Sequence, residues 1–262
     1  MRIWFWMGMA VLLAACAEPE QSIPHTDLDP GDVVSGYTFL TPETQAQQDD
    51  DFLNPGFLWI DRGADLFASA EGVSRACVAC HTENDMSLQG AAAGYPAIDE
   101  QTGALVNLEG RINLCRSRHQ DAAPLDDESE DLLSLTAYVA HLSRGQPVAV
   151  SLTGRLQPYY DKGRDYFFTR RGQLNLSCHH CHDLNWGRQL RGDTISQGHG
   201  NGFPTYRLEW ETLGSLHRRF RDCDAGVRAE PKAYGSEDYT ALELYLAIRG
   251  AGLPIETPAV RR

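Results

Sequence analysis

The chain has 262 residues, enough for one large domain or two of ordinary size. Hydrophobic residues make up 42% of it, an ordinary fraction for a globular protein with a buried core. The formal net charge of −13 argues against nonspecific nucleic-acid binding and suits a basic protein partner.

The segment at positions 1–17 has the features of an export leader. Arg2 supplies a positive charge, and the apolar run at residues 3–13 is too short to span a bilayer as a helix. Small residues follow and allow two cleavage sites: one leaves Cys16 as a lipid-anchored N-terminus, and the other is ordinary cleavage after Ala17. Both predict a mature protein in the periplasm, soluble or lipid-anchored, in an oxidising compartment.

Residues 18–52 form an acidic N-terminal arm with few large apolar side chains. This composition predicts an extended, partly ordered segment. Two roles remain open for it: a flexible tether between leader and domain, or an arm that wraps a partner subunit.

The rest of the chain repeats itself, which indicates two homologous units at residues 53–147 and 150–262. Four landmarks recur in the same order and at similar offsets. They are residues 61–67 and 161–167, the motifs at 77–81 and 178–182, Cys115 and Cys223, and the helical patterns at 132–145 and 239–250. In each unit a leading helix precedes the motif, at 61–70 and 159–170, and an amphipathic helix closes the unit.

Each unit carries one CxxCH motif, formed by Cys77, Cys80 and His81 and by Cys178, Cys181 and His182. In such motifs two thiols bind the vinyl groups of a haem and the adjacent histidine binds its iron. A redox dithiol and a zinc site are the alternatives. Two copies at equivalent positions of an exported chain favour two covalently bound haem c groups. The predicted fold is therefore mainly α, with two tandem cytochrome c-like domains from an internal duplication, each enclosing one haem.

The distal iron ligand is predicted to be cysteine. The methionines are residues 1, 7, 9 and 86; three lie in the leader, and Met86 is too near His81 to reach the opposite haem face. Cys115 and Cys223 stand where such domains present a distal ligand, and thiolate should lower the reduction potential relative to Met. A Cys115–Cys223 disulfide and distal ligation by His119 and His217 remain as alternatives.

Arginines gather around the second of these cysteines, at positions 218, 219, 221 and 228 (Arg218, Arg219, Arg221 and Arg228). Guanidinium groups stabilise a thiolate and bind oxyanions, so the cluster indicates an anion pocket beside a reactive sulfur. A solvated docking face is the alternative. Cys115 also has arginines nearby, at positions 111, 116 and 118, so charge alone does not choose between the two sites.

With these residues in place, the chain resembles the SoxA family, the dihaem subunits of the SoxAX cytochromes of bacterial thiosulfate oxidation. The most specific segments are residues 203–207, 216–223 and 228–231. The resemblance implies an L-cysteine S-thiosulfotransferase in which Cys223 is the active-site ligand, often as a persulfide, and the first haem is structural. It also implies a SoxX-like monohaem partner, a SoxYZ-like carrier protein as substrate together with thiosulfate, and a cytochrome c that accepts two electrons.

Two other functions are compatible with the motifs. A dihaem electron-transfer cytochrome without substrate chemistry explains the haem sites but gives Cys223 and its arginines no role. A dihaem peroxidase typically needs a methionine-ligated haem, and no suitable methionine is present.

Overall fold

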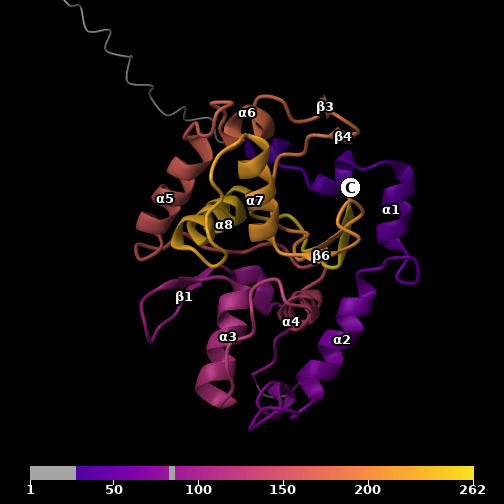
Figure 1. Cartoon of the computed structure of the whole chain (residues 1–262), viewed down its shortest axis with the longest axis vertical. Coiled ribbons are helices and arrows are strands. Elements are labelled where there is room, and N and C mark those ends of the chain that lie inside the picture. Colours follow the sequence, from indigo (N-terminus) through magenta and orange to yellow (C-terminus); the bar gives the residue numbers. More distant parts are fainter. Residues whose placement is uncertain (1–27, 83–85) are drawn as a thin grey trace, which may run out of the picture.

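The computed structural model describes residues 28–82 and 86–262. Figure 1 shows two lobes stacked along the long axis of the molecule, with residues 57–141 below, residues 157–262 above, and the residues that precede position 50 beside the upper lobe. The leader and Cys16 lie outside the described residues. No helix in the described part of the chain is long and apolar enough to cross a membrane.

The lower lobe is mainly helical, and a short hairpin precedes its third helix. Its elements are α2 (Phe57–Ala68), η3 (Cys77–Ala79), η4 (Ala91–Gly94), β1 (Ala97–Ile98), β2 (Leu105–Val106), α3 (Leu108–His119) and α4 (Glu130–His141).

The upper lobe follows a similar order and adds a small sheet. Its elements are α5 (Gln157–Phe168), α6 (Cys178–His182), β3 (Gln189–Leu190), β4 (Asp193–Thr194), β5 (Thr205–Arg207), β6 (Thr212–Gly214), α7 (Leu216–Gly226), α8 (Glu237–Arg249) and β7 (Ala259–Arg261). Strand β5 pairs with β6 in antiparallel fashion and with β7 in parallel. The sequence analysis did not predict these strands.

The main helix pair of each lobe crosses at a glycine. A Cβ atom on Gly63 of α2 would overlap the carbonyl of Ser134 in α4, and one on Gly163 of α5 would overlap the carbonyl of Ala241 in α8. Only glycine permits backbones to approach this closely, so these two residues set how the leading and closing helices pack.

The closing helices begin in the same way. Ser129 and Ser236 are N-caps whose side chains accept hydrogen bonds from the backbone N–H groups of Leu132 and Tyr239. Acidic residues follow in the first turn and pair with a cation on the partner helix. Arg62 contacts Asp131, and Lys162 contacts Asp238 at 2.8 Å.

The hairpins before α3 and α7 pair their strands in the same register. Equivalent residues of the two hairpins are separated along the chain by the same number of residues as Cys115 and Cys223. Each hairpin ends at an N-cap: the Asn107 side chain accepts from Gly110 N at 2.9 Å, and the Ser215 side chain accepts from Arg218 N at 3.1 Å. The paired residues are Ala97 with Val106 and Ile98 with Leu105, and then Thr205 with Gly214 and Tyr206 with Leu213.

The described part of the N-terminal arm is folded, which corrects the expectation of an extended tether. It contains η1 (Pro30–Asp32), η2 (Gly36–Phe39) and α1 (Pro42–Asp49), and Figure 1 shows α1 beside the C-terminus. The Gln48 side chain accepts a hydrogen bond from Val260 N at 3.1 Å, and Asn54 donates to Pro258 O at 2.8 Å. The arm thus packs on the second half of its own chain.

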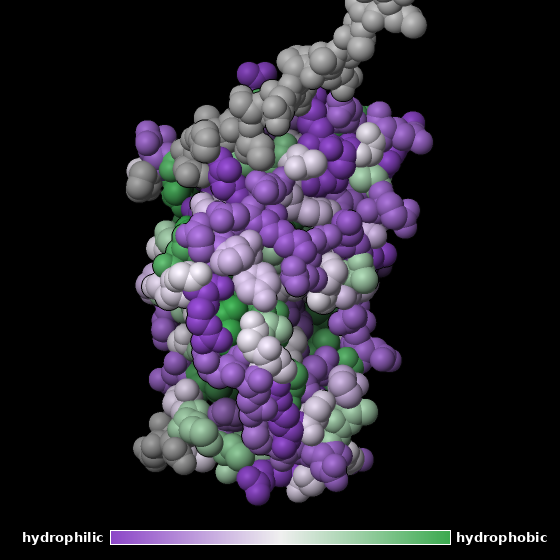
Figure 2. Space-filling view, turned by 90° about the vertical axis from the view of Figure 1, so that its left-hand side faces the viewer, coloured by the Kyte–Doolittle hydropathy of each residue, from purple (hydrophilic) through white to green (hydrophobic). Residues whose placement is uncertain are grey.

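The core lies within each lobe and between them. The largest buried cluster is aromatic and belongs to the upper lobe, with Phe167, Tyr239 and Tyr245 almost fully buried. Cavities of about 80 and 110 Å³ lie where the lobes meet, and Leu108 and Leu216 line the smaller one. In Figure 2 apolar atoms surface in a recess at mid-height of an otherwise hydrophilic face.

Candidate functional site

Each CxxCH segment places its two thiols on a single helical turn. Cys77 and Cys80 are joined by a backbone hydrogen bond of 3.1 Å in η3, while Cys178 and Cys181 lie on α6. Two thiols at this spacing on one turn face the same side, as attachment to the two vinyl groups of one haem requires. The donor set therefore fits haem c at both motifs.

Both motif histidines are oriented as iron ligands. Nδ1 of His81 lies 2.9 Å from Met86 O, and Nδ1 of His182 lies 2.8 Å from Ser196 O. A carbonyl at Nδ1 fixes the tautomer that carries its proton there, which leaves Nε2 for the metal. Burial lowers the pKa of His182 to about 4, so its imidazole is neutral near pH 7, as ligation requires.

Met86 lies on the Nδ1 side of the His81 imidazole, which is the wrong side for a distal ligand. Its carbonyl binds Nδ1 of His81, opposite the nitrogen that would face iron, and its side chain is 57% exposed. The expectation that Met86 cannot cross to the other haem face agrees with this geometry.

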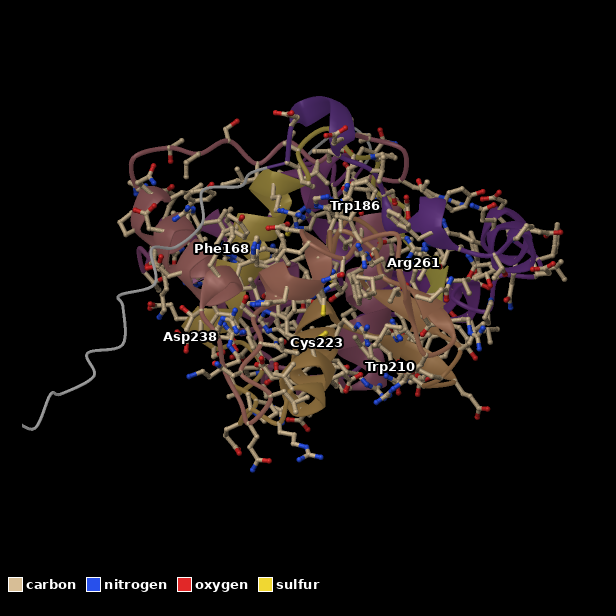
Figure 3. All side chains as sticks on the ribbon, turned by 90° about the horizontal axis from the view of Figure 1, so that it is seen from above. Phe168, Trp186, Trp210, Cys223, Asp238 and Arg261 are labelled. Atoms are coloured by element: carbon tan, nitrogen blue, oxygen red, sulfur yellow. The ribbon has the colours of Figure 1, made fainter. Side chains whose placement is uncertain are left out.

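Cys115 and Cys223 lie on equivalent helices, each near the thiols of its own motif. The Cys115 sulfur of α3 interacts electrostatically with Cys77 and Cys80, and the Cys223 sulfur of α7 does so with Cys178 and Cys181. Figure 3 shows Cys223 toward the middle of the molecule, with Trp210 to one side.

The rival assignments for these cysteines do not match the structure. All six described cysteines are free thiols, so Cys115 and Cys223 do not form a disulfide. His119 is exposed, and His217 is buried with Nε2 3.2 Å from Glu243 and Nδ1 accepting from Gly235 N. Cys115 and Cys223 remain the candidate donors, one near each pair of motif thiols.

The structure separates the four arginines predicted near Cys223. Among these four, Arg219 is the arginine whose pKa is raised chiefly by its interaction with Cys223. The Arg218 guanidinium stacks on Trp210, 4.3 Å from the ring centre. Arg221 donates to Lys232 O, and Arg228 donates to Gln173 at 3.4 Å. These two are held away from the sulfur by partners of their own.

Arg207 is a site residue that the sequence analysis quoted but did not assign. It is the last residue of β5, its side chain is only 8% exposed, and it interacts electrostatically with Cys223 and Arg219. Burial and the like charge of Arg219 lower the pKa of Arg207. The sequence did contain a signal for Arg207. It follows Asp99 by the same number of residues by which Cys223 follows Cys115, so the two residues occupy equivalent positions of the repeat.

The residue after Cys223 fixes the orientation of α7. The buried Asp224 carboxylate accepts hydrogen bonds from Tyr166 at 2.6 Å and Tyr239 at 2.8 Å, and it lies 3.4 Å from Arg171. Arg171 also lies 3.7 Å from the Cys178 sulfur. These contacts tie α7 to α5, α8 and the CxxCH segment, so Cys223 is held in place relative to the motif.

Comparison with known proteins agrees with this arrangement. Residues 62–148 match the family model described as SoxA/TsdA, cytochrome c domain. The L-cysteine S-thiosulfotransferase subunit SoxA of Pseudaminobacter salicylatoxidans is 42% identical over 87% of this chain and 81% of its own length. That of Rhodovulum sulfidophilum is 41% identical over 88% and 80%. The crystal structure of SoxXA from P. pantotrophus contains a chain with a TM-score of 0.84 and 38% identity, over 88% of this chain and 87% of the other.

The helical fold and paired cysteine–histidine motifs define a c-type cytochrome. Within that class, the identity along most of both chains is decisive. The chain belongs to the SoxA family of L-cysteine S-thiosulfotransferase subunits.

Proposed function

We propose that this chain is the catalytic subunit of an L-cysteine S-thiosulfotransferase and joins thiosulfate to a cysteine of a SoxYZ-like carrier protein. The proposal rests on one observation above the others. Cys223 lies beside the second CxxCH motif together with Arg219 and Arg207, so a sulfur, an anion site and a redox group meet at one place.

We also propose that the chain holds two haem c groups in units related by internal duplication, at residues 53–147 and 150–262. Support comes from the matched helix crossings at Gly63 and Gly163, the matched serine caps and the common hairpin register. Each unit would hold haem through its own two thiols, with His81 and Cys115 as iron ligands in the first. His182 and Cys223 would serve in the second.

The overall reaction removes two electrons and one proton. Thiosulfate and the carrier thiol become a carrier S-thiosulfonate, with a new bond between the outer thiosulfate sulfur and the carrier sulfur. We propose that thiosulfate first bonds to Cys223, releasing the two electrons. The carrier thiolate then attacks the outer sulfur, and Cys223 leaves as a thiolate in an exchange of the thiol–disulfide type. Bound haem c would supply the one-electron steps toward a cytochrome acceptor.

The protein side chains have distinct tasks in this scheme. Arg219 and Arg207 hold the sulfonate oxygens beside Cys223 through charge-assisted hydrogen bonds. The Asp224 contacts fix the helix that carries the sulfur. The second site is the proposed active site, and the first haem is proposed to be structural.

The proposed setting is the periplasm, after removal of the leader, with a possible lipid anchor at Cys16. A SoxX-like monohaem cytochrome is the proposed partner, in keeping with the SoxXA complex that the structural relative forms. The net charge of −13 suits steering of a basic cytochrome acceptor.

The test is a conjugation assay with the complex of this chain and its monohaem partner, a carrier protein, thiosulfate and a cytochrome acceptor. Cys223→Ala should abolish carrier conjugation while haem stays attached, because attachment uses other cysteines. Near-normal turnover by Cys223→Ala would remove the covalent role and favour a pure electron carrier. Turnover of hydrogen peroxide in place of thiosulfate would favour a peroxidase.

A further inference from the structure

The hairpins before α3 and α7 carry opposite charges at one equivalent position. Asp99 follows β1, and Arg207 ends β5 at the corresponding place in the second unit. Arg207 follows Asp99 by the same number of residues by which Arg219 follows Arg111 and Cys223 follows Cys115. The paired strand residues of the two hairpins are related by this same number. An acid therefore stands in the first unit where a base stands in the second.

In the first unit the acid neutralises the arginines around its cysteine. The Asp99 side chain is 1% exposed and accepts from Arg118 at 2.7 and 2.8 Å, from Arg111 at 2.9 Å and from the Thr102 hydroxyl at 2.7 Å. The Arg118 hydrogen bond is the main cause that holds the pKa of Asp99 well below its usual range, so the carboxylate stays charged. It occupies the place where an external anion would bind.

In the second unit no buried carboxylate takes that place among the residues described. Arg207 is 8% exposed, its guanidinium lies 5.0 Å from the ring centre of Trp210, and it interacts electrostatically with Arg219 and Cys223. The acid in contact with Arg207 and near Arg219 is Glu209, whose side chain is 50% exposed. Glu209 contacts Arg207 closely but lies 3.8 Å from Nη1 of Arg219. The carboxylate that lies near both cations is thus half-exposed, and Asp222 and Asp193 also interact with Arg219.

We infer that this position decides which of the two cysteine sites binds thiosulfate. Arg207 is a substrate-binding residue that, with Arg219, holds the sulfonate of thiosulfate beside Cys223. Asp99 is an internal anion that closes the corresponding place beside Cys115. This inference rests on the proposed function, and it adds the residue that distinguishes the two sites.

The physical reason is the placement of the carboxylate that lies near both arginines of each site. A buried carboxylate in direct contact with both guanidinium groups satisfies them without a ligand. A half-exposed one at the rim is screened by water and leaves the repulsion between Arg207 and Arg219 uncompensated. A dianion that enters between them relieves this repulsion and gains desolvated hydrogen bonds.

The test is calorimetric titration of thiosulfate into the oxidised haem-loaded complex, without carrier, for wild type, Arg207→Gln, Arg207→Lys and Arg111→Gln. Wild type should bind one thiosulfate per complex. Arg207→Gln should weaken binding roughly tenfold or more, the effect of losing one charge-assisted contact, and raise KM for thiosulfate in proportion. Arg207→Lys should retain part of the affinity. Arg111→Gln, the matched control, should bind as wild type does.

Unchanged affinity in Arg207→Gln, equal losses in both glutamine variants, or no binding by wild type would overturn the inference. Unfolding midpoints and haem spectra check that the variants fold, and Arg207→Lys reads the charge if Arg207→Gln does not fold. The two proposals fail separately. Thiosulfate binding with the expected contrast but no carrier conjugation would overturn the proposed function alone.

Discussion

Gly163 lies directly against the backbone carbonyl of Ala241, with no room for a methyl group between α5 and α8. Gly163→Ala should therefore force the two helices apart and lower the free energy of unfolding by about 1–3 kcal/mol or more. Denaturant unfolding of the haem-loaded protein measures this change. Gly94→Ala is the matched control, because nothing lies within 4 Å of the added Cβ, and its effect should stay within about 0.5 kcal/mol. Equal effects would contradict close packing at this crossing.

Arg219 should matter far more than the outer arginines of its cluster. Because Arg219 interacts with the Cys223 sulfur, Arg219→Leu should raise KM for thiosulfate roughly 10- to 100-fold. Arg221→Leu and Arg228→Leu should change it less than about threefold, since those guanidinium groups bind Lys232 O and Gln173. Steady-state kinetics of carrier conjugation gives the ranking. A larger loss in either outer variant would show that the cluster rearranges around the anion.

Replacing Cys115 should change one haem and leave the other intact. Cys115 lies near Cys77 and Cys80 but on a different lobe from Cys223. In Cys115→Ala, electron paramagnetic resonance of the oxidised protein should lose one low-spin thiolate signal, while pyridine haemochrome analysis still reports two haems per chain. Most of the conjugation activity should remain, because the chemistry is proposed at the other site. An unchanged spectrum would mean that Cys115 is not an iron ligand.

The contribution of Glu109 to stability should fall as the pH rises from about 5 to 8. Glu109 lines both cavities between the lobes, and burial, together with the nearby charge of Glu243, raises its pKa to about 7. His217 opposes this shift, while Glu128, whose own pKa is raised by burial, adds to it. A carboxyl group whose pKa is higher in the folded state binds more protons there. The stabilisation that Glu109 contributes is therefore lost as the pH rises from its ordinary pKa of 4.5 through its raised pKa of about 7.

Unfolding midpoints measured between pH 5 and 8 check this trend. The amide of Glu109→Gln cannot ionise, so the unfolding midpoint of wild type relative to that of Glu109→Gln should fall across this range. A difference between the two midpoints that stays constant or grows with pH would contradict the role of Glu109.

The haem motifs, the distal cysteines and the leading helices could be predicted from the sequence because each depends on local spacing. The expected helix at 61–70 corresponds to α2, whereas the helices that carry Cys115 and Cys223 were not predicted. Very short strands carry too little periodicity to detect. Strand β5, for example, pairs with β7, which lies at the far end of the chain.

The roles of individual arginines depended on contacts that sequence proximity does not reveal. Arg221 and Arg228 are close to Cys223 along the chain but have partners elsewhere, whereas Arg207 reaches the site from another element. The fold of the arm was likewise hidden, because its binding partner is at the opposite end of the sequence.

The contact between Gln48 and Val260 has a consequence for the order in which the chain can fold under the proposed export. During such export the arm would emerge before both lobes, and strand β7, which receives it, would emerge after them. The lower lobe has all its helices by residue 141, so it can form while the upper lobe is still being threaded. Until the final residues are released, β5 keeps one edge without its parallel neighbour, and such an edge invites pairing with other chains. Loss of residues 259–261 would therefore harm the second lobe and the arm together.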